Sequence, residues 1–355
     1  MNLMKWSFFK ITPVSLQFYE AVNGRRWLEK GLMFGGCMGS IRYAVAGDPI
    51  EQSLSPLLFV LVSNHLGLEE VSSPDIVPAS TIENALAWGY AGAVPVEIEW
   101  YHTSAPLGKF RSKTLIEKAI VQAQTIESVD ASLHAIHPFS SPQPKIEGPD
   151  FKRFDFEEIW MNLTTPLKHQ LQSMAVSNLD CSDSIQSVNA LRWDGQGWWC
   201  MSTDGIGMAA VLLHRGVGLG SCVGMIGGGS AARSFAHAWT TLGGHLNFLG
   251  GRREIELDDV LFSNEKPICV VEFEEHELVE LPQLRFKASY DLSIDLERIM
   301  QPDNHIYDGR WLLVAQHLEA WRTLWAPHLA SQLPSLEVLL ARLIECEKVL
   351  RSYKR

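Results

Sequence analysis

The sequence predicts an α/β protein built of two domains, and three observations point to this class. A chain of 355 residues, 46% of them hydrophobic, is long and apolar enough to fill two cores of ordinary size. In its first third, an apolar strand, a Pro-containing turn and an apolar helix follow one another, which is the opening of a βαβ unit. In its second half, a strand, a glycine turn and a helix follow one another over residues 223–242.

The bulk charge argues against two classes of partner. Asp and Glu outnumber Lys and Arg 41 to 30, and a net charge of −11 gives no general attraction to nucleic acid or to anionic membrane lipid. No apolar run approaches the roughly 20 residues that span a bilayer. The 6 cysteines lack the spacing of a zinc or redox motif, so we expect reduced thiols, no metal site and a cytoplasmic protein.

The N-terminal part is predicted to hold an extension, the first strand and a long insertion. Residues 1–40 lack the small-residue cleavage site that follows a secretory leader, so we interpret them as an extension without an assigned structure. The first strand is expected over residues 41–46, and a Ser-x-Ser-Pro segment leads into a helix over residues 56–66. Residues near 95–150 carry mixed signals, and we interpret them as an insertion.

The middle of the chain is predicted to add three strands and a helix. A strand over residues 159–163 ends at a Thr-Thr-Pro turn, after which residues 167–176 have a helical pattern. Two tryptophan-flanked strands are expected over residues 188–193 and 198–202, joined by an Asp-Gly-Gln-Gly hairpin turn.

The clearest local signal is a glycine turn between a strand over residues 223–226 and a helix over residues 233–242. At such a turn the missing side chains let backbone N–H groups approach a pyrophosphate at the helix N-terminus. The alternative is a plain turn without a ligand. We interpret the segment as a Rossmann-like cofactor-binding turn formed by Gly227, Gly228, Gly229, Ser230 and Ala231.

A basic pair follows the next predicted strand, which covers residues 245–249. Arg252 and Arg253 stand where an NAD site needs Asp or Glu for the ribose hydroxyl groups. Two guanidinium groups without an acid favour NADP over NAD, because they complement the additional phosphate. The alternative is a solvated basic turn.

Lys168 and Asp204 are the candidate catalytic pair. Hydride transfer to a ketone needs a proton at the nascent alkoxide, and a lysine held beside a carboxylate in a cleft can supply it near neutral pH. Each residue taken alone has the alternative of being a surface charge. Both lie in segments that match a known pattern, and this favours the catalytic interpretation.

That pattern resembles the shikimate dehydrogenase family, from Tyr43 to about Leu343. The matching segments are residues 43–49 with Ser53 and Ser55, then 162–168, 188–190, 202–205 and 308–316. The resemblance implies a cytoplasmic monomer or homodimer that reversibly reduces 3-dehydroshikimate to shikimate with NADPH, in aromatic amino acid biosynthesis. It implies that Lys168 and Asp204 are catalytic. It also implies substrate contacts from Ser53, Ser55, Asn162, Thr164, Asn189 and Gln316.

The two domains follow from the same resemblance and from two C-terminal helices predicted over residues 311–325 and 334–352. An open α/β substrate-binding domain is expected over residues 41–203 and 305–355. A Rossmann-like NADP-binding domain is expected over residues 204–304.

Two departures from the family fall in the cofactor half. Residues 270–274 stand where the family has an Asn-Ala-Thr loop near the nicotinamide, and their acidic side chains would repel a phosphate. Ile294 occupies the place from which a tyrosine of the family reaches the substrate.

Several alternatives therefore stay open. The chain could be a quinate/shikimate or other cyclitol-acid dehydrogenase with the same pocket, or a non-catalytic ligand-binding homologue with a degenerate cofactor site. Among the site residues, Ser55 could instead cap a helix, and Asn189 could bond its own backbone.

Overall fold

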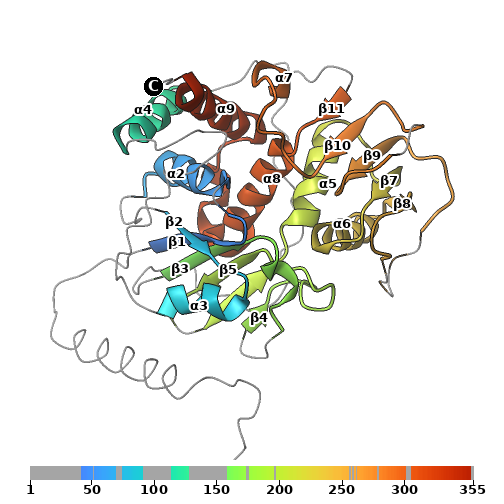
Figure 1. Ribbon diagram of the computed structural model, residues 1–355, viewed down its shortest axis with the longest axis horizontal. Helices are drawn as coiled ribbons and strands as arrows, with labels where there is room; N and C mark the ends of the chain where they lie inside the picture. Colours follow the sequence, from blue (N-terminus) through green and yellow to red (C-terminus); the bar gives the residue numbers. More distant parts are fainter. Residues whose placement is uncertain are drawn as a thin grey trace, which may run out of the picture.

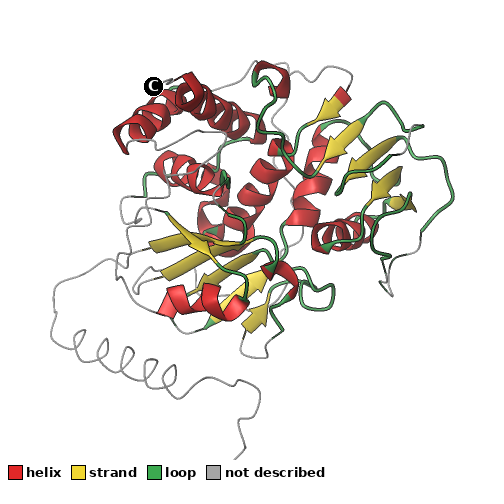
Figure 2. Cartoon of the chain, viewed as in Figure 1, coloured by secondary structure: helices red, strands yellow, loops and turns green. Residues whose placement is uncertain are grey.

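The computed structural model shows an α/β protein with two sheets joined by helices (Figure 1, Figure 2). It describes residues 41–352 except 51, 69–73, 91–112, 128–157, 173–175, 196, 256, 258–259, 261, 278–279 and 301–304. The predicted extension and most of the predicted insertion lie outside the described residues. The predicted α/β class is confirmed.

The first sheet has six strands among the described residues, in the order β2-β1-β3-β5-β6-β4. They are β1 (Ile41–Gly47), β2 (Asp75–Pro78), β3 (Glu158–Leu163), β4 (Val176–Asn178), β5 (Ala190–Trp193) and β6 (Trp198–Met201). Strand β1 pairs in parallel with β2 and β3, whereas β5 runs antiparallel to β3 and β6. The predicted hairpin is confirmed, and Asp194 closes its turn by accepting the N–H of Gly197 at 2.8 Å.

Both faces of β1 are buried, which explains why Arg42 is its one charged residue. Tyr43 packs into the apolar cluster that contains helix α2 (Ser55–His65). Ala44 packs into a second cluster, which contains helix α3 (Ile82–Tyr90). Successive side chains of a strand point to opposite faces, so α2 and α3 cover the two sides of this sheet (Figure 1).

The second sheet has the order β11-β10-β9-β7-β8, and every neighbouring pair in it is parallel. Its strands are β7 (Cys222–Ile226), β8 (His245–Phe248), β9 (Cys269–Glu272), β10 (Arg285–Lys287) and β11 (Ile306–Tyr307). Helix α6 (Ser230–Thr241) packs against it. A parallel sheet with a helix after a glycine turn is typical of the Rossmann-like arrangement that the sequence predicts.

The division between the predicted domains stays a prediction, which the grouping of the strands favours. Strands of the first sheet lie within residues 41–201, and strands of the second within residues 222–307. One short strand crosses the predicted boundary, because β11 pairs with β10 of the second sheet although residues from 305 onward were assigned to the substrate-binding domain.

Helices join the two sheets. Helix α5 (Asp204–His214) packs closely against α8 (Arg310–Ala320), and α8 lies between the sheets in Figure 1. Helix α9 (Leu336–Ser352) packs on α8, on α2 and on α4 (Lys113–Gln124), which is the described part of the insertion. The short helix α7 (Glu297–Met300) precedes the last strand.

An aromatic cluster and a buried ion pair fill the core beside the first sheet. The rings stack or meet edge to face, and they belong to Tyr43, Phe59, Trp160, Trp321 and Trp325. Next to them, Arg192 donates to both carboxylate oxygens of Glu158, at 2.8 and 2.7 Å. The indole of Trp160 donates to the same carboxylate at 2.6 Å, so this buried charge is fully paired.

One predicted helix is wrong. The sequence favours a helix over residues 167–176, but the structure has a single 3-10 turn over Leu167–His169. The backbone carbonyl of Lys168 accepts the N–H of Val188 at 2.8 Å, a partner from a distant part of the chain, instead of the N–H four residues onward that a helix would use. The turn leaves Lys168 at the end of β3 instead of inside a helix.

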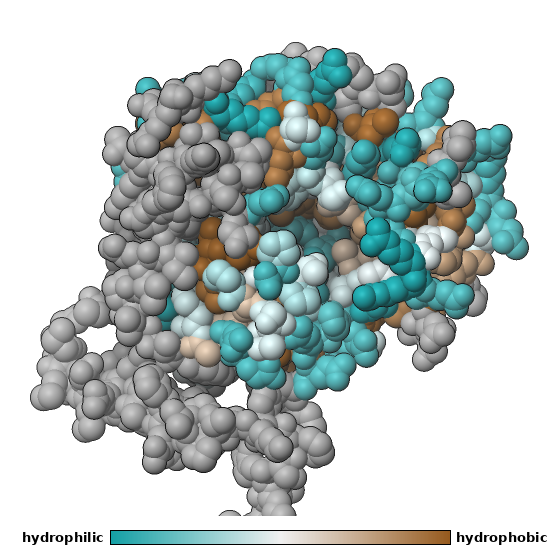
Figure 3. Space-filling view, in the orientation of Figure 1, coloured by the Kyte–Doolittle hydropathy of each residue, from teal (hydrophilic) through white to brown (hydrophobic). Residues whose placement is uncertain are grey.

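Within the described ranges, no helix has the length and apolar character needed to cross a bilayer. Hydrophilic residues cover much of the described surface on the face drawn in Figure 3. Among the same residues, no group of three or more His, Cys, Asp or Glu side chains is arranged to hold a metal ion.

Candidate active site

The structure brings Lys168 and Asp204 together, although 36 positions separate them in the chain. Lys168 Nζ lies 2.6 Å from Asp204 Oδ2. The side chain of Asp204 is 2% exposed and that of Lys168 is 17% exposed, so the carboxylate is buried while the ammonium reaches the surface of the site. A buried charge needs a partner of this kind, because removing one partner of a buried ion pair costs about 3–5 kcal/mol of stability.

The start of α5 holds Asp204 in place. Asp204 is the first residue of the helix, where the helix dipole stabilises a negative charge. The next N–H, that of Gly205, donates to the hydroxyl of Ser234 at 2.8 Å. A Cβ on Gly205 would lie 2.1 Å from the backbone oxygen of Ser234, so only glycine allows α5 and α6 to approach this closely.

Asn189 completes the partners of the carboxylate. Its Nδ2 donates to Asp204 Oδ1 at 3.0 Å and to the Thr203 hydroxyl at 2.9 Å. Its Oδ1 accepts the backbone N–H of Thr203 at 2.7 Å. The alternative that Asn189 bonds its own backbone is therefore wrong, and both oxygens of Asp204 are occupied by donors.

Tyr43 connects the serine segment to this group, and the sequence analysis did not single it out. Its hydroxyl donates to Asn162 Oδ1 at 2.6 Å, and Asn162 Nδ2 donates to the backbone oxygen of Asn189 at 3.3 Å. Burial raises the pKa of Tyr43 well above its usual value, while a hydrogen bond from the Ser55 hydroxyl opposes that shift. Its position in a fully buried strand is the available signal, because a buried tyrosine hydroxyl needs a partner.

Ser53 and Ser55 lie in the segment between β1 and α2. Ser53 Oγ accepts the backbone N–H of Ser55 at 3.3 Å. Ser55 is the first residue of α2, whose N-cap is Leu54, and no side chain caps this end of the helix. The alternative that Ser55 serves as the helix cap is therefore wrong.

Thr164 and Gln316 are the two remaining residues of the predicted substrate site. Thr164 follows β3, its N–H donates to the backbone oxygen of Ala46 at 2.9 Å, and its side chain is half-buried. Gln316 is half-buried on α8, where a Cβ on Gly207 of α5 would lie 2.7 Å from the Gln316 nitrogen. Helix α8 therefore passes directly behind the helix that carries Asp204.

The glycine turn has the form that a dinucleotide phosphate requires. Gly227 adopts φ +107°, which disfavours a side chain, and its N–H donates to the backbone oxygen of Gly250 at 2.8 Å. A Cβ on Gly229 would meet nothing within 4 Å, so space is open at the N-terminus of α6. Ala232 is fully buried against the sheet. These residues fit a pyrophosphate at the helix N-terminus.

The two arginines after β8 are exposed, and the carboxylate of Glu274 lies beside them at the turn. Glu274 Oε1 accepts the backbone N–H of Arg252 at 2.5 Å. A Cβ on Gly227 would lie 3.2 Å from Glu274 Cγ, so this side chain covers one side of the turn. The backbone oxygen of Arg253 lies against Gly228 in the same way.

The acidic run over residues 270–274 is less repulsive than the sequence suggests. Glu272 is buried, pairs with Arg285 and lies 3.3 Å from His276 Nε2. Its charge is thereby neutralised within the sheet. Of the two acids in this run, Glu274 is the one that lies at the glycine turn.

Comparison with known proteins gives one sequence match. No protein-family model matches the chain. A shikimate dehydrogenase (NADP(+)) from Methylibium petroleiphilum is 34% identical over 73 residues, which are 20% of this chain and 25% of that protein. The chain thus matches about a quarter of the length of this curated relative.

Solved structures match over most of the chain. The shikimate dehydrogenase of Aquifex aeolicus has a TM-score of 0.50 and 15% identity, and the match covers 85% of this chain and 96% of that one. The enzyme of Mycobacterium tuberculosis has a TM-score of 0.51 and 15% identity, with 86% and 98% covered. A shikimate dehydrogenase in complex with NADP+ has a TM-score of 0.51 and 13% identity, with 88% and 98% covered. The predicted resemblance is therefore confirmed, and the fold is that of the shikimate dehydrogenases.

We expect Gly205→Ala to lower the free energy of unfolding by about 1–3 kcal/mol, because it overpacks the contact between α5 and α6. Chemical denaturation measures the change. Gly197→Ala is the matched control, since nothing lies within 4 Å of a Cβ there. Equal stability of the two variants would contradict the close approach at Gly205.

Proposed function

We propose that this chain, which has the fold of the shikimate dehydrogenases, is an oxidoreductase that reversibly reduces 3-dehydroshikimate to shikimate with NADPH. The observation that carries the proposal is the pair formed by Lys168, in the turn after β3, and Asp204, at the start of α5, 2.6 Å apart. A lysine held in this way is a positioned general acid. The sequence resemblance supplies the substrate and the setting, aromatic amino acid biosynthesis.

Lys168 is the proposed proton donor. When bound, NADPH supplies the hydride that reduces the substrate carbonyl carbon. Lys168 Nζ gives a proton to the carbonyl oxygen as negative charge develops there, and Asp204 Oδ2 keeps the ammonium group in place. In the oxidative direction, Lys168 takes the proton from the substrate hydroxyl group.

The proposed cofactor site is the glycine turn together with the basic pair after β8. Gly227 makes the turn, and residues 228–231 offer backbone N–H groups and open space at the N-terminus of α6. Arg252 and Arg253 are exposed cations that favour NADP over NAD by pairing with its additional phosphate. An NAD-dependent enzyme is the less favoured alternative.

The proposed substrate site is the row of polar groups between the serine segment and Lys168. Ser53 and Ser55 offer hydroxyl groups for the carboxylate of the ring acid. The groups proposed for its ring hydroxyls are those of Asn162, Thr164, Asn189, Asp204 and Gln316. Asn162 already uses Oδ1 and one Nδ2 hydrogen within the protein, so its second Nδ2 hydrogen is the group it can offer.

Two other functions fit the same site. A quinate/shikimate or other cyclitol-acid dehydrogenase would use the same acid and the same serine segment. A ligand-binding homologue without hydride transfer is favoured by one observation, the Glu274 carboxylate beside the glycine turn. In each case we expect a cytoplasmic monomer or homodimer.

A steady-state assay of shikimate oxidation with NADP and NAD in parallel tests the proposal, with quinate as a second substrate. We expect oxidation of shikimate that is faster with NADP. Faster turnover of quinate would favour the cyclitol-acid alternative. Shikimate binding without any binding of NADPH, followed by its fluorescence up to millimolar concentration, would reject the enzyme.

Lys168→Ala should lower turnover by about two to four orders of magnitude, the usual effect of losing a general acid. Its affinity for NADPH should change little, because Lys168 lies on the substrate side. Lys266→Ala, which removes an exposed lysine near the start of β9, is the control and should retain turnover. Near-normal turnover of Lys168→Ala would contradict the role of Lys168 as the general acid.

Glu274→Gln should tighten NADPH binding by about 3- to 10-fold, because it removes a negative charge beside the proposed phosphate site. Fluorescence titration at low and high salt measures the effect, which should shrink as salt screens the charge. Glu275→Gln makes the same charge change at an exposed neighbour and should have the smaller effect. Unchanged or weaker binding by Glu274→Gln would count against a phosphate at this turn.

A further inference from the structure

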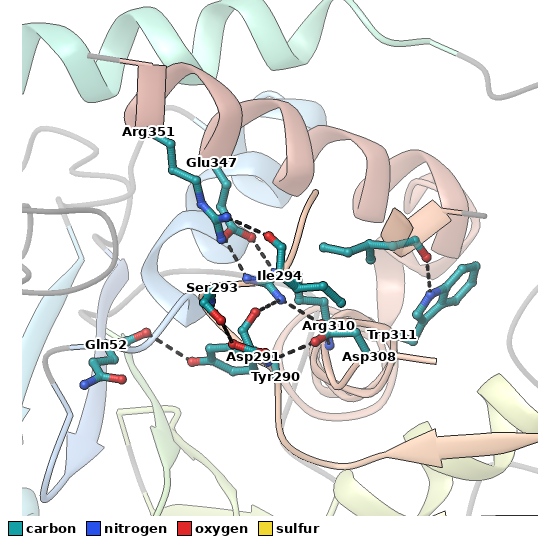
Figure 4. A network of polar contacts seen from close by, with 11 residues as sticks. Gln52, Tyr290, Asp291, Ser293, Ile294, Asp308, Arg310, Trp311, Glu347 and Arg351 are labelled. Carbon is teal, nitrogen blue, oxygen red and sulfur yellow. Dashed lines mark hydrogen bonds and ion pairs between the residues drawn. The ribbon is translucent and has the colours of Figure 1, made fainter. Parts of the chain in front are cut away.

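Tyr290 reaches from the cofactor half of the chain to the serine segment. It follows β10, and its hydroxyl donates to the backbone oxygen of Gln52 at 3.1 Å, 238 positions away in the sequence (Figure 4). The backbone N–H of Leu54 donates to the same phenol oxygen. The hydroxyl group therefore bonds the backbone on both sides of Ser53.

The chemical state of the phenol suits this double contact. Burial raises the pKa of Tyr290 to about 12, although the hydrogen bond from Leu54 opposes the shift. At neutral pH the hydroxyl keeps its proton, so it can donate to one backbone group and accept from another.

A buried arginine fixes the ring of Tyr290 from behind. The guanidinium carbon of Arg310 lies 5.3 Å from the ring centroid, close enough for a cation–π contact. Glu347 accepts from Arg310 Nε and Nη2 at 2.7 and 2.9 Å, and Asp308 accepts from Nη1 at 2.8 Å. This bidentate, fully buried pair leaves the guanidinium one orientation.

The backbone next to the ring is held by the same group. Asp308 Oδ2 accepts the N–H of Asp291 at 3.0 Å, and Arg310 Nη1 donates to the backbone oxygen of Asp291 at 3.1 Å. Figure 4 shows these contacts converging from α8 and α9 on the loop that carries Tyr290. The position of the Tyr290 ring is therefore fixed by several contacts, whereas the segment that it contacts is an exposed turn at Gln52.

We propose that Tyr290 is a positioning residue that holds the Ser53–Ser55 segment in the conformation that receives the substrate carboxylate. The proposal rests on the proposed function, because it assigns that role to the two serines. Within the segment, the N–H of Ser53 donates to the Ile50 oxygen at 3.0 Å, and Ser53 Oγ accepts from Ser55. Both bonds are local, whereas the phenol of Tyr290 contacts the exposed start of the segment from a distant part of the chain. Tyr290 acts through the loop and needs no contact with the substrate itself.

Tyr290→Phe keeps the ring and its contact with Arg310 but removes both hydrogen bonds to the segment. We expect the KM and the dissociation constant for shikimate to rise about tenfold, the effect of losing ordinary hydrogen bonds. Turnover at saturating shikimate and affinity for NADPH should change less than about twofold, because Lys168 and the glycine turn are untouched.

The matched control is Tyr307→Phe. The hydroxyl of Tyr307 accepts from Arg215 Nε at 2.9 Å, so this variant also loses a phenol hydrogen bond, but one between β11 and the end of α5. Its KM for shikimate should stay at the wild-type value. An equal rise in both variants would mean that the change is general loosening, and would overturn the proposal.

A second measurement needs no ligand. Hydrogen exchange of the Leu54 amide, followed by NMR, should be about tenfold faster in Tyr290→Phe than in the wild type and unchanged in Tyr307→Phe. Unchanged exchange or an unchanged KM in Tyr290→Phe would overturn the inference while leaving the enzyme intact. A wild-type protein that neither binds nor oxidises shikimate would instead reject the proposed function and, with it, the role of Tyr290.

Discussion

The arrangement of the two sheets depends on the burial of one carboxylate. Asp204 begins the helix that leads from the first sheet to the second, and it is almost completely buried there. An ionised carboxylate is stable in such a place only when it is paired and hydrogen-bonded. Lys168 and Asn189, both from the part of the chain that forms the first sheet, supply these partners. A contact between the two parts of the chain is therefore also the contact that positions the candidate acid.

The same requirement for partners extends across the first sheet. One continuous series of hydrogen bonds connects Ser55, Tyr43, Asn162, Asn189, Asp204 and Lys168. Because each buried polar group in it has a partner, its members have defined orientations before any ligand arrives. Such preorganisation is what binding and proton transfer require of a small polar site. The hydrogen bond from Tyr290 to Gln52 holds the exposed segment next to Ser55, where this series of hydrogen bonds begins.

Local patterns were enough to predict most of the fold, whereas the pair of Lys168 and Asp204 was predicted from the family resemblance. The strand, glycine turn and helix around Gly227 are set by residues within one short segment. The contacts that the sequence did not predict are long-range. The helix expected after Leu167 fails because the Lys168 carbonyl bonds Val188, and Glu274 reaches the turn because β9 lies beside β7. In each case the residue that makes the contact comes from a different helix, strand or loop, so a local sequence pattern does not include it.

The substrate side and the cofactor side of the candidate site differ in how their charges are balanced, and this difference bears on the proposed function. On the substrate side, the buried charge of Asp204 is paired with Lys168. On the cofactor side, Glu274 holds a backbone N–H and stands beside an open turn. A dinucleotide would bring further negative charge to that turn, whereas a neutral hydroxyl of a ring acid brings none to Lys168. Affinity for the cofactor, rather than the placement of Lys168, is therefore the property that would distinguish an enzyme from a ligand-binding protein with this sequence.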